Sequence, residues 1–133
     1  CVEVSIWGIL PMRDLVAMAK TMTDEHRLRA IAALKDRELC LCQLVELLEL
    51  APSTVSRHMG LLQQVRLVEA RKQGRWTYFR LAGDEAPDAA KNATAWVFGA
   101  LARDEQVRAD ARRLKEILKT DPEALCRKQS ACR

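Results

Sequence analysis

The chain has 133 residues, of which 49% are hydrophobic and 30% are charged, and its formal net charge is +4. This length suits one domain with a modest core, and the low aromatic content beside abundant Ala and Leu favours a mostly helical fold. Five cysteines without the spacing of a secreted scaffold argue against a disulfide framework and for a reducing cytoplasm. No apolar run reaches membrane-spanning length, so we expect no membrane partner.

Three segments are expected along the chain. Residues 1–11, CVEVSIWGILP, read as a vector-derived or upstream extension, because Met12 is a plausible natural start. Residues 12–119 are predicted to form the folded domain. Residues 120–133 are predicted to be a polar, mobile tail that contains cysteines.

Two amphipathic helices are predicted in the first third of the domain. The first spans Met12 to Met22, and Thr23-Asp24-Glu25 then supplies an N-cap and acidic residues for the second. Apolar residues recur at helical spacing in both: Leu15, Val16, Met18, Ala19 and Met22 in the first, and Leu28, Ile31, Ala32 and Leu34 in the second.

The stretch 38–81 has the most informative pattern. Residues 38–40 form a short extended lead-in to a third helix, from about Leu41 to Leu48. Pro52 suits the first position of a fourth helix, where its missing N–H costs nothing. Two strands follow, joined by a turn at residues 72–75 with Gly74. Helix-turn-helix followed by a basic hairpin is typical of a winged DNA-binding domain.

The fourth helix and the hairpin carry the candidate DNA contacts. Six basic residues lie between Arg57 and Arg80 against the single acid Glu69, a balance that suits a phosphate backbone. An ordinary solvated surface is the alternative. The predicted DNA-binding residues are Ser53, Thr54, Ser56, Arg57, His58, Gln63, Arg71, Lys72 and Arg75. For His58 a partly buried structural role is equally open.

One long helix is predicted from about Asp88 to Lys119. A helix of that length extends beyond the face that a small winged domain can cover. Its uncovered apolar stripe predicts a partner, most simply a second copy of the chain. The residues of that stripe are Trp96, Val97, Ala100, Leu101, Val107, Ala111, Leu114, Ile117 and Leu118.

Cys40 and Cys42 form a Cys-x-Cys pair at the start of the third helix, and they are the leading metal-ligand candidates. Thiolates select soft, thiophilic ions. Residues i and i+2 lie about 200° apart on a helix, so both sulfurs can hold one ion only if the first turn is extended or unwinds. That deformation, passed to the fourth helix, is the predicted switch. Both cysteines could instead be small buried hydrophobic residues. Cys126 and Cys132 could add a third sulfur, form a separate site or be idle.

The segments RLRAIAAL, ELCLCQL, STVSRHMGLL and RLVEARKQGRWTYFRL, in this order, resemble the ArsR/SmtB family of metal-sensing repressors, and ELCLC resembles its arsenic-responsive branch. The resemblance covers Met12 to about Leu118. It implies a homodimeric winged helix-turn-helix, paired through its first and last helices. Such a protein binds palindromic operator DNA when metal-free and releases it on binding a soft metal or metalloid. As(III) or Sb(III) is the expected inducer, Zn, Cd or Pb the alternative, and no organic cofactor is expected.

Three positions depart from that family's pattern. No third cysteine closely follows Cys42, Arg66 stands where Gly usually closes the recognition helix, and Ala51 stands where a Ser N-cap is common. The last two substitutions each cost about 1 kcal/mol. A winged-helix module without an inducer therefore stays open. An enzyme is not expected, because no set of acid, base and nucleophile is visible.

Overall fold

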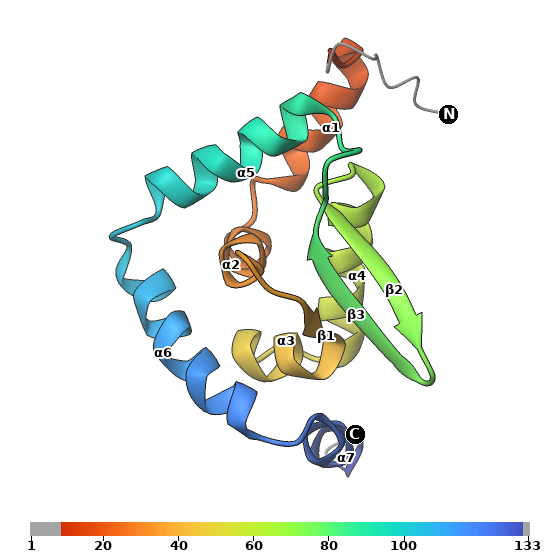
Figure 1. The fold of residues 1–133 in the computed structure, drawn as a ribbon, viewed down its shortest axis with the longest axis vertical. Coiled ribbons are helices and arrows are strands. Elements are labelled where there is room, and N and C mark those ends of the chain that lie inside the picture. The colour runs from red at the N-terminus through yellow and green to blue at the C-terminus, as the bar shows by residue number, and fades with distance from the viewer. Residues whose placement is uncertain (1–8, 132–133) are drawn as a thin grey trace.

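The computed structural model describes residues 9–131, and Figure 1 shows a mostly helical domain with one small sheet, as predicted. The elements are α1 (Met12–Thr21), α2 (Glu25–Ala33), β1 (Leu39–Cys40), α3 (Leu41–Leu48), α4 (Pro52–Gln64), β2 (Val68–Gln73), β3 (Trp76–Leu81), α5 (Asp88–Ala100), α6 (Glu105–Lys119) and α7 (Pro122–Ala131).

The helix-turn-helix follows from local sequence signals. Asp24 caps α2, since its side chain accepts from the backbone N–H groups of His26 at 2.8 Å and Arg27 at 3.2 Å. Pro52 is the first residue of α4. The side chains between α2, α3 and α4 make a continuous core of close-packed apolar residues: Ile31, Leu34, Leu44, Leu47, Val55, Met59 and Leu62.

The predicted hairpin is present as β2 and β3, and the sheet contains a third strand. The strand order is β1–β3–β2, with all neighbours antiparallel. Gln73 pairs with Trp76 across the turn, where Gly74 has a positive φ of 63° that suits a residue without Cβ. Cys40 of β1 pairs with Tyr78 of β3. The strand that leads into α3 is therefore paired with β3, the central strand of the sheet, which with β2 forms the wing of the domain.

The prediction of one long helix over residues 88–119 is wrong. The chain breaks after Ala100, and a new helix begins at Glu105 with Asp104 as its N-cap, accepting from the backbone N–H of Val107 at 3.0 Å. α5 packs on α2, whereas α6 packs across α2 and α3, so that α5, α6 and α7 form an arc around them (Figure 1). The break gives α5 and α6 different directions, so Val97 of α5 and Leu114 of α6 can both be buried on one small domain, while Trp96 of α5 stays exposed.

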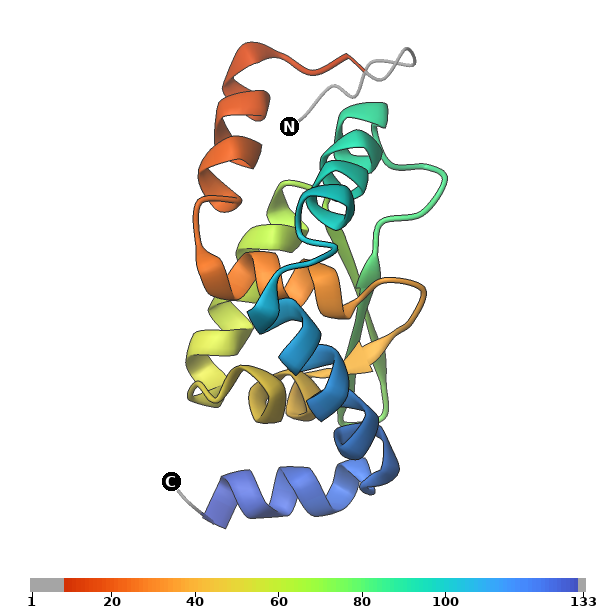
Figure 2. The same cartoon turned by 90° about the vertical axis from the view of Figure 1, so that its left-hand side faces the viewer.

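The segment predicted as a polar, mobile tail, residues 120–133, contains a helix. Residues Pro122–Ala131 form α7, which lies against α3 (Figure 2). Leu125 of α7 is buried at 5% exposure and anchors the helix to the core. Cys132 lies outside the described residues. Among the helices of residues 9–131, none is long and apolar enough to cross a membrane.

Arg66 adopts the left-handed conformation that its position after α4 implies. Its φ is 65°, and the following Leu67 donates its backbone N–H to the carbonyl of Leu62 at 3.0 Å. Because an L side chain is strained there, Arg66→Gly should raise the free energy of unfolding by about 1 kcal/mol. Urea denaturation at pH 7.5 measures this, and an unchanged or lower midpoint would contradict it.

Candidate DNA-binding face and cysteine site

The exposed side of α4 carries most of the predicted DNA contacts. Apolar residues at helical spacing face the core on the opposite side of this helix. α4 lies beside the hairpin (Figure 1). The candidates that are exposed on α4 are Ser53, Thr54, Ser56, Arg57 and Gln63. Short hydroxyl side chains allow close approach of the backbone, and Arg57 is long enough to reach a base edge.

His58 does not belong to that surface, so of its two predicted roles the structure supports the buried structural one and not the DNA contact. It is 8% exposed, its Nδ1 lies 2.9 Å from Nη1 of Arg27, and its ring stacks on His26 with centroids 6.0 Å apart. Position 58 is three residues after Val55 and four before Leu62, so it shares their buried face. That spacing is the signal that could have placed it inside.

The free energy of unfolding should depend on pH through the buried His58, which lies against His26 and Arg27. Burial lowers the pKa of His58, with Arg27, His26 and Arg57 acting in the same direction and Asp24 opposing them. The unfolded chain, where a histidine pKa is about 6.5, therefore binds more protons than the folded chain, and stability falls as pH falls below that value. Between pH 7.5 and 5.5, wild type should lose more unfolding free energy in urea titrations than His58→Asn, which keeps an acceptor near Nδ1. Equal losses would contradict this assignment.

Of the three hairpin cations predicted to bind DNA, two are engaged within the chain. The Arg71 guanidinium donates to both carboxylate oxygens of Glu38, at 2.6 and 2.8 Å, and stacks on Tyr78. This pairing lowers the pKa of Glu38. Arg75 pairs with Glu123 of α7 at 3.2 Å. Lys72 has no ion pair within residues 9–131, so it is the cation of the hairpin most available for phosphate.

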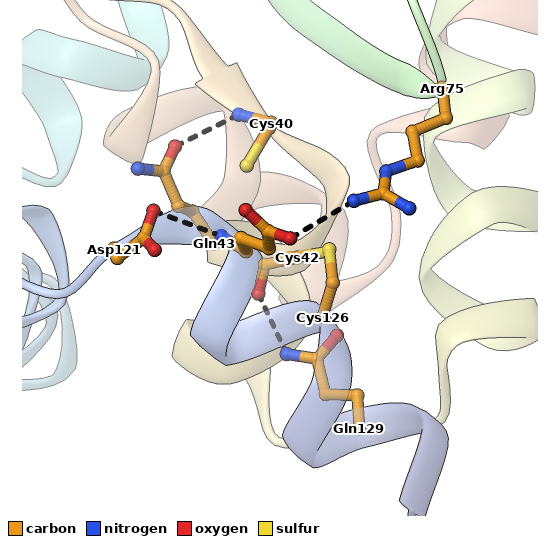
Figure 3. Close-up of a disulfide and its surroundings, with 8 residues drawn as sticks. Cys40, Cys42, Gln43, Arg75, Asp121, Cys126 and Gln129 are labelled. Carbon is orange, nitrogen blue, oxygen red and sulfur yellow. Dashed lines mark hydrogen bonds and ion pairs between the residues drawn. A yellow bond between two sulfur atoms is a disulfide. The ribbon is translucent and has the colours of Figure 1, made fainter.

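The cysteine site differs from the predicted pair. Cys42 is bonded to Cys126 of α7, 84 residues away in sequence, with their Cα atoms 5.5 Å apart (Figure 3). Beside this disulfide the Gln129 side chain donates to the Cys42 carbonyl at 2.9 Å. The cysteine spacing argued against a disulfide framework, whereas the structure holds one disulfide, between these two cysteines. Proximity between such distant segments depends on the docking of α7, which no local pattern reveals.

Cys40 is separate from this bond. It is 1% exposed, and its backbone N–H donates to the Gln43 side chain at 2.9 Å in a capping box at the start of α3. Burial raises the pKa of its thiol, which disfavours the thiolate that metals require. Within residues 9–131 no three His, Cys, Asp or Glu residues are grouped to hold an ion. The structure therefore brings together two sulfurs, Cys42 and Cys126.

The other end of α3 is held by α6. Arg113 donates to the carbonyls of Leu47 and Glu46, both at 2.9 Å, and pairs with Glu49 at 2.7 Å. The last carbonyls of a helix have no hydrogen-bond partner within it, so a cation there supplies the missing donors and also interacts favourably with the helix dipole. This residue was missed from the sequence because Arg113 lies more than sixty residues from the carbonyls it caps. The C-terminal helices thus contact both ends of α3.

An apolar face extends over α1 and α5. Leu15 and Val16 of α1 and Trp96 of α5 are large apolar side chains that are 53%, 44% and 70% exposed. Between the two helices is a hollow of about 460 Å³ whose lining includes Leu15, Met18 and Trp96. Of the predicted apolar stripe, Trp96 of α5 and Leu118 of α6 are exposed, whereas Val97, Leu114 and Ile117 are buried against the domain.

Comparisons with known proteins agree with this architecture. A sequence profile described as "Bacterial regulatory protein, arsR family" matches residues 24–70. The arsenic resistance transcriptional regulator ArsR1 of Pseudomonas putida is 32% identical over 111 residues, which are 80% of this chain and 84% of that protein. The arsenical resistance operon repressor of Escherichia coli is 37% identical over 68 residues, 50% of this chain and 58% of the repressor. The cadmium resistance regulatory protein CadC of Listeria innocua is 31% identical over 61 residues, 45% and 51% of the two chains.

Solved structures give the same fold. Reduced HlyU from Vibrio cholerae superposes with a TM-score of 0.56 and 28% identity, over 66% of this chain and 88% of HlyU. The homodimeric winged helix-turn-helix domain of Mb0332 from Mycobacterium bovis superposes with a TM-score of 0.59 and 21% identity, over 71% and 83% of the two chains. Both leave more than a quarter of this chain uncovered.

Proposed function

This chain belongs to the ArsR family of bacterial regulatory proteins, and we propose that it is a cytoplasmic repressor that releases operator DNA when As(III) or Sb(III) binds its cysteine thiolates. The family and its relatives are transcriptional regulators rather than enzymes, and metal or metalloid response is common to several of them. The observation that carries the proposal is the meeting of Cys42 and Cys126 at the start of α3, the helix directly before α4.

Double-stranded operator DNA is the proposed ligand of α4 and the β2–β3 hairpin. The exposed hydroxyls and Arg57 of α4 would enter the major groove, and Lys72 of the hairpin would contact phosphate. Arg71 and Arg75 would contribute only where DNA competes with their partners, Glu38 and Glu123. His58 is excluded from this set because its ring is held inside the domain.

A homodimer would place two such surfaces on one operator. The apolar face of α1 and α5 supports pairing there, because a second copy would cover Leu15, Val16 and Trp96 at once. The Mb0332 domain of the same fold is described as homodimeric. Two recognition helices related by a twofold axis would read a palindrome with half-sites about one helical turn apart.

The thiolates of Cys42 and Cys126, formed when their disulfide is reduced, would hold the inducer. Sulfur donors fit a soft ion such as As(III), and two of them are already within bonding distance. Binding would fix α7 on α3 and shift the first turn of α3, which hydrogen-bonds to the wing through β1. Operator affinity would then fall through linkage between the two sites.

The proposal is tested by release of DNA from the reduced protein. An operator is first obtained by selecting bound sequences from random DNA, and binding is then followed by fluorescence anisotropy. We expect arsenite to weaken binding about 5- to 150-fold, the range of common allosteric couplings, with a smaller effect of zinc. Release by zinc, cadmium or lead instead of arsenite would favour the divalent-metal alternative. Binding unchanged by every metal would leave a DNA-binding module without an inducer.

A further inference from the structure

A hollow of about 410 Å³ borders the Cys42–Cys126 disulfide between the start of α3, the start of β3 and α7. Cys42 and Cys126 both line it, and both residues are partly exposed. The other lining residues are Leu41, Arg75, Trp76, Thr77, Glu123 and Arg127. The hollow is large enough for a small molecule and has a reactive bond at its wall.

Charge in this hollow favours an anion. Arg75 and Arg127 contribute two guanidinium groups, whereas Glu123 contributes the one carboxylate of the lining. Glu123 pairs with Arg75 at 3.2 Å, and Arg127 has no ion pair among the residues that the structure describes (Figure 3 shows Arg75 beside the disulfide). An arginine fork that is free to bind matches a carboxylate geometrically.

We propose that this hollow binds a small anionic thiol, of the class of carboxylate-bearing peptide thiols such as glutathione, and presents it to the disulfide for exchange. The ligand's carboxylate pairs with Arg127 while its apolar part packs against Trp76. Its thiolate then faces the bond between Cys42 and Cys126. The exchange depends on neither DNA nor metal, so it goes beyond the proposed repressor function, but it supplies the two free thiolates that an inducer needs.

The direction of attack follows from the position of Cys42. It is the second residue of α3, so the positive end of the helix dipole lies near it and favours negative charge on its sulfur. The ligand thiolate therefore attacks the Cys126 sulfur, the disulfide breaks, and Cys42 leaves as a thiolate while Cys126 carries a mixed disulfide. A second ligand thiolate attacks the ligand's own sulfur in that adduct. The products are the oxidised ligand dimer and a free Cys126 thiolate.

The test compares three thiols of different charge on the oxidised full chain. These are 3-mercaptopropionate, 2-mercaptoethanol and cysteamine, with rates expressed per thiolate and read by mass spectrometry after acid quench. We expect the anionic thiol to react about tenfold faster than the cationic one at low salt, and the preference to shrink as salt screens it. Peptide mapping should locate the first adduct on Cys126. Equal rates per thiolate, or a first adduct on Cys42, would overturn the proposal.

Three single variants test whether the preference for the anionic thiol comes from the charges in the hollow or from a general loss of folding. Arg127→Gln should remove most of the preference for the anionic thiol, and Glu123→Gln should increase it, because Arg75 is then released. Lys128→Gln, the adjacent cation on α7 that faces Glu46 outside the hollow, should leave the preference unchanged. The opposite directions expected for Arg127→Gln and Glu123→Gln cannot come from a general loss of folding. A fall of the preference in Lys128→Gln equal to that in Arg127→Gln would also overturn the proposal.

Discussion

Replacing Asp110 by Ala is expected to lower the free energy of unfolding by about 3–5 kcal/mol, the cost of leaving a buried partner charge alone. Asp110 is 4% exposed and accepts from Nε and Nη2 of Arg29 at 2.8 and 2.9 Å, and from the Gln106 side chain at 2.9 Å. The hydrogen bonds to this carboxylate raise the pKa of Arg29, and without them the guanidinium still keeps its charge, because an arginine side chain stays protonated in proteins. Denaturation by urea at pH 7.5 with the disulfide intact gives the change.

A double variant and a surface pair serve as controls. Arg29→Met/Asp110→Leu removes both charges together and should recover most of the loss, since apolar replacements of buried ion pairs are often neutral or stabilising. Glu116→Ala breaks the exposed pair of α6 with Lys119 and should cost about 1 kcal/mol or less. A loss below about 1 kcal/mol in Asp110→Ala would mean that water reaches Arg29 and that the pair does not hold α6 on α2.

The consequence of this ion pair reaches the cysteine site through α3. Asp110 holds α6 on α2, and Arg113, one turn further on, caps the last carbonyls of α3. Beyond α6 the chain enters α7, whose Cys126 meets Cys42 at the first turn of α3. The helices α6 and α7 therefore contact α3, the helix before α4, at both of its ends. A change in the position of α7 therefore acts directly on α3, which packs against α4 and sets its orientation.

Much of the fold could be predicted because its signals are local. The start of α2 at a capping Asp24, the start of α4 at Pro52 and the turn at Gly74 each depend on residues within a few positions of one another. The break before α6 was missed, because apolar spacing continued across residues 101–104 and outweighed the capping signal of Asp104. The spacing of apolar residues alone does not distinguish one long helix from two consecutive helices that point in different directions.

The candidate site was less predictable because its contacts are distant in sequence. The exposed polar side of α4, including Ser53 and Arg57, followed from helical period, and the same period correctly applied would have placed His58 inside. The engagement of Arg71 by Glu38 and the meeting of Cys42 with Cys126 depend on how the sheet and α7 pack. Spacing in the sequence cannot give such pairings before the tertiary fold is known.

Cys126→Ser is expected to abolish the arsenite-induced loss of operator affinity, whereas Cys40→Ser should keep it. In the reduced protein Cys42 and Cys126 provide the two sulfurs that meet, while the Cys40 thiol is buried with a raised pKa. Full coupling of about 1–3 kcal/mol, a 5- to 150-fold change in affinity, should therefore fall to none in Cys126→Ser. Anisotropy titrations of a selected operator with reduced protein, with and without arsenite, measure this.

The design separates the two pairs of cysteines that could bind the inducer. Cys42→Ser should lose the response whichever partner Cys42 uses, so it serves as the common control. Arsenite release retained in Cys126→Ser and lost in Cys40→Ser would instead identify the Cys-x-Cys pair, with the start of α3 unwinding to bring its sulfurs together. Affinity for DNA without arsenite should stay within about twofold of wild type in Cys126→Ser, because no residue of α4 or the hairpin tip is changed.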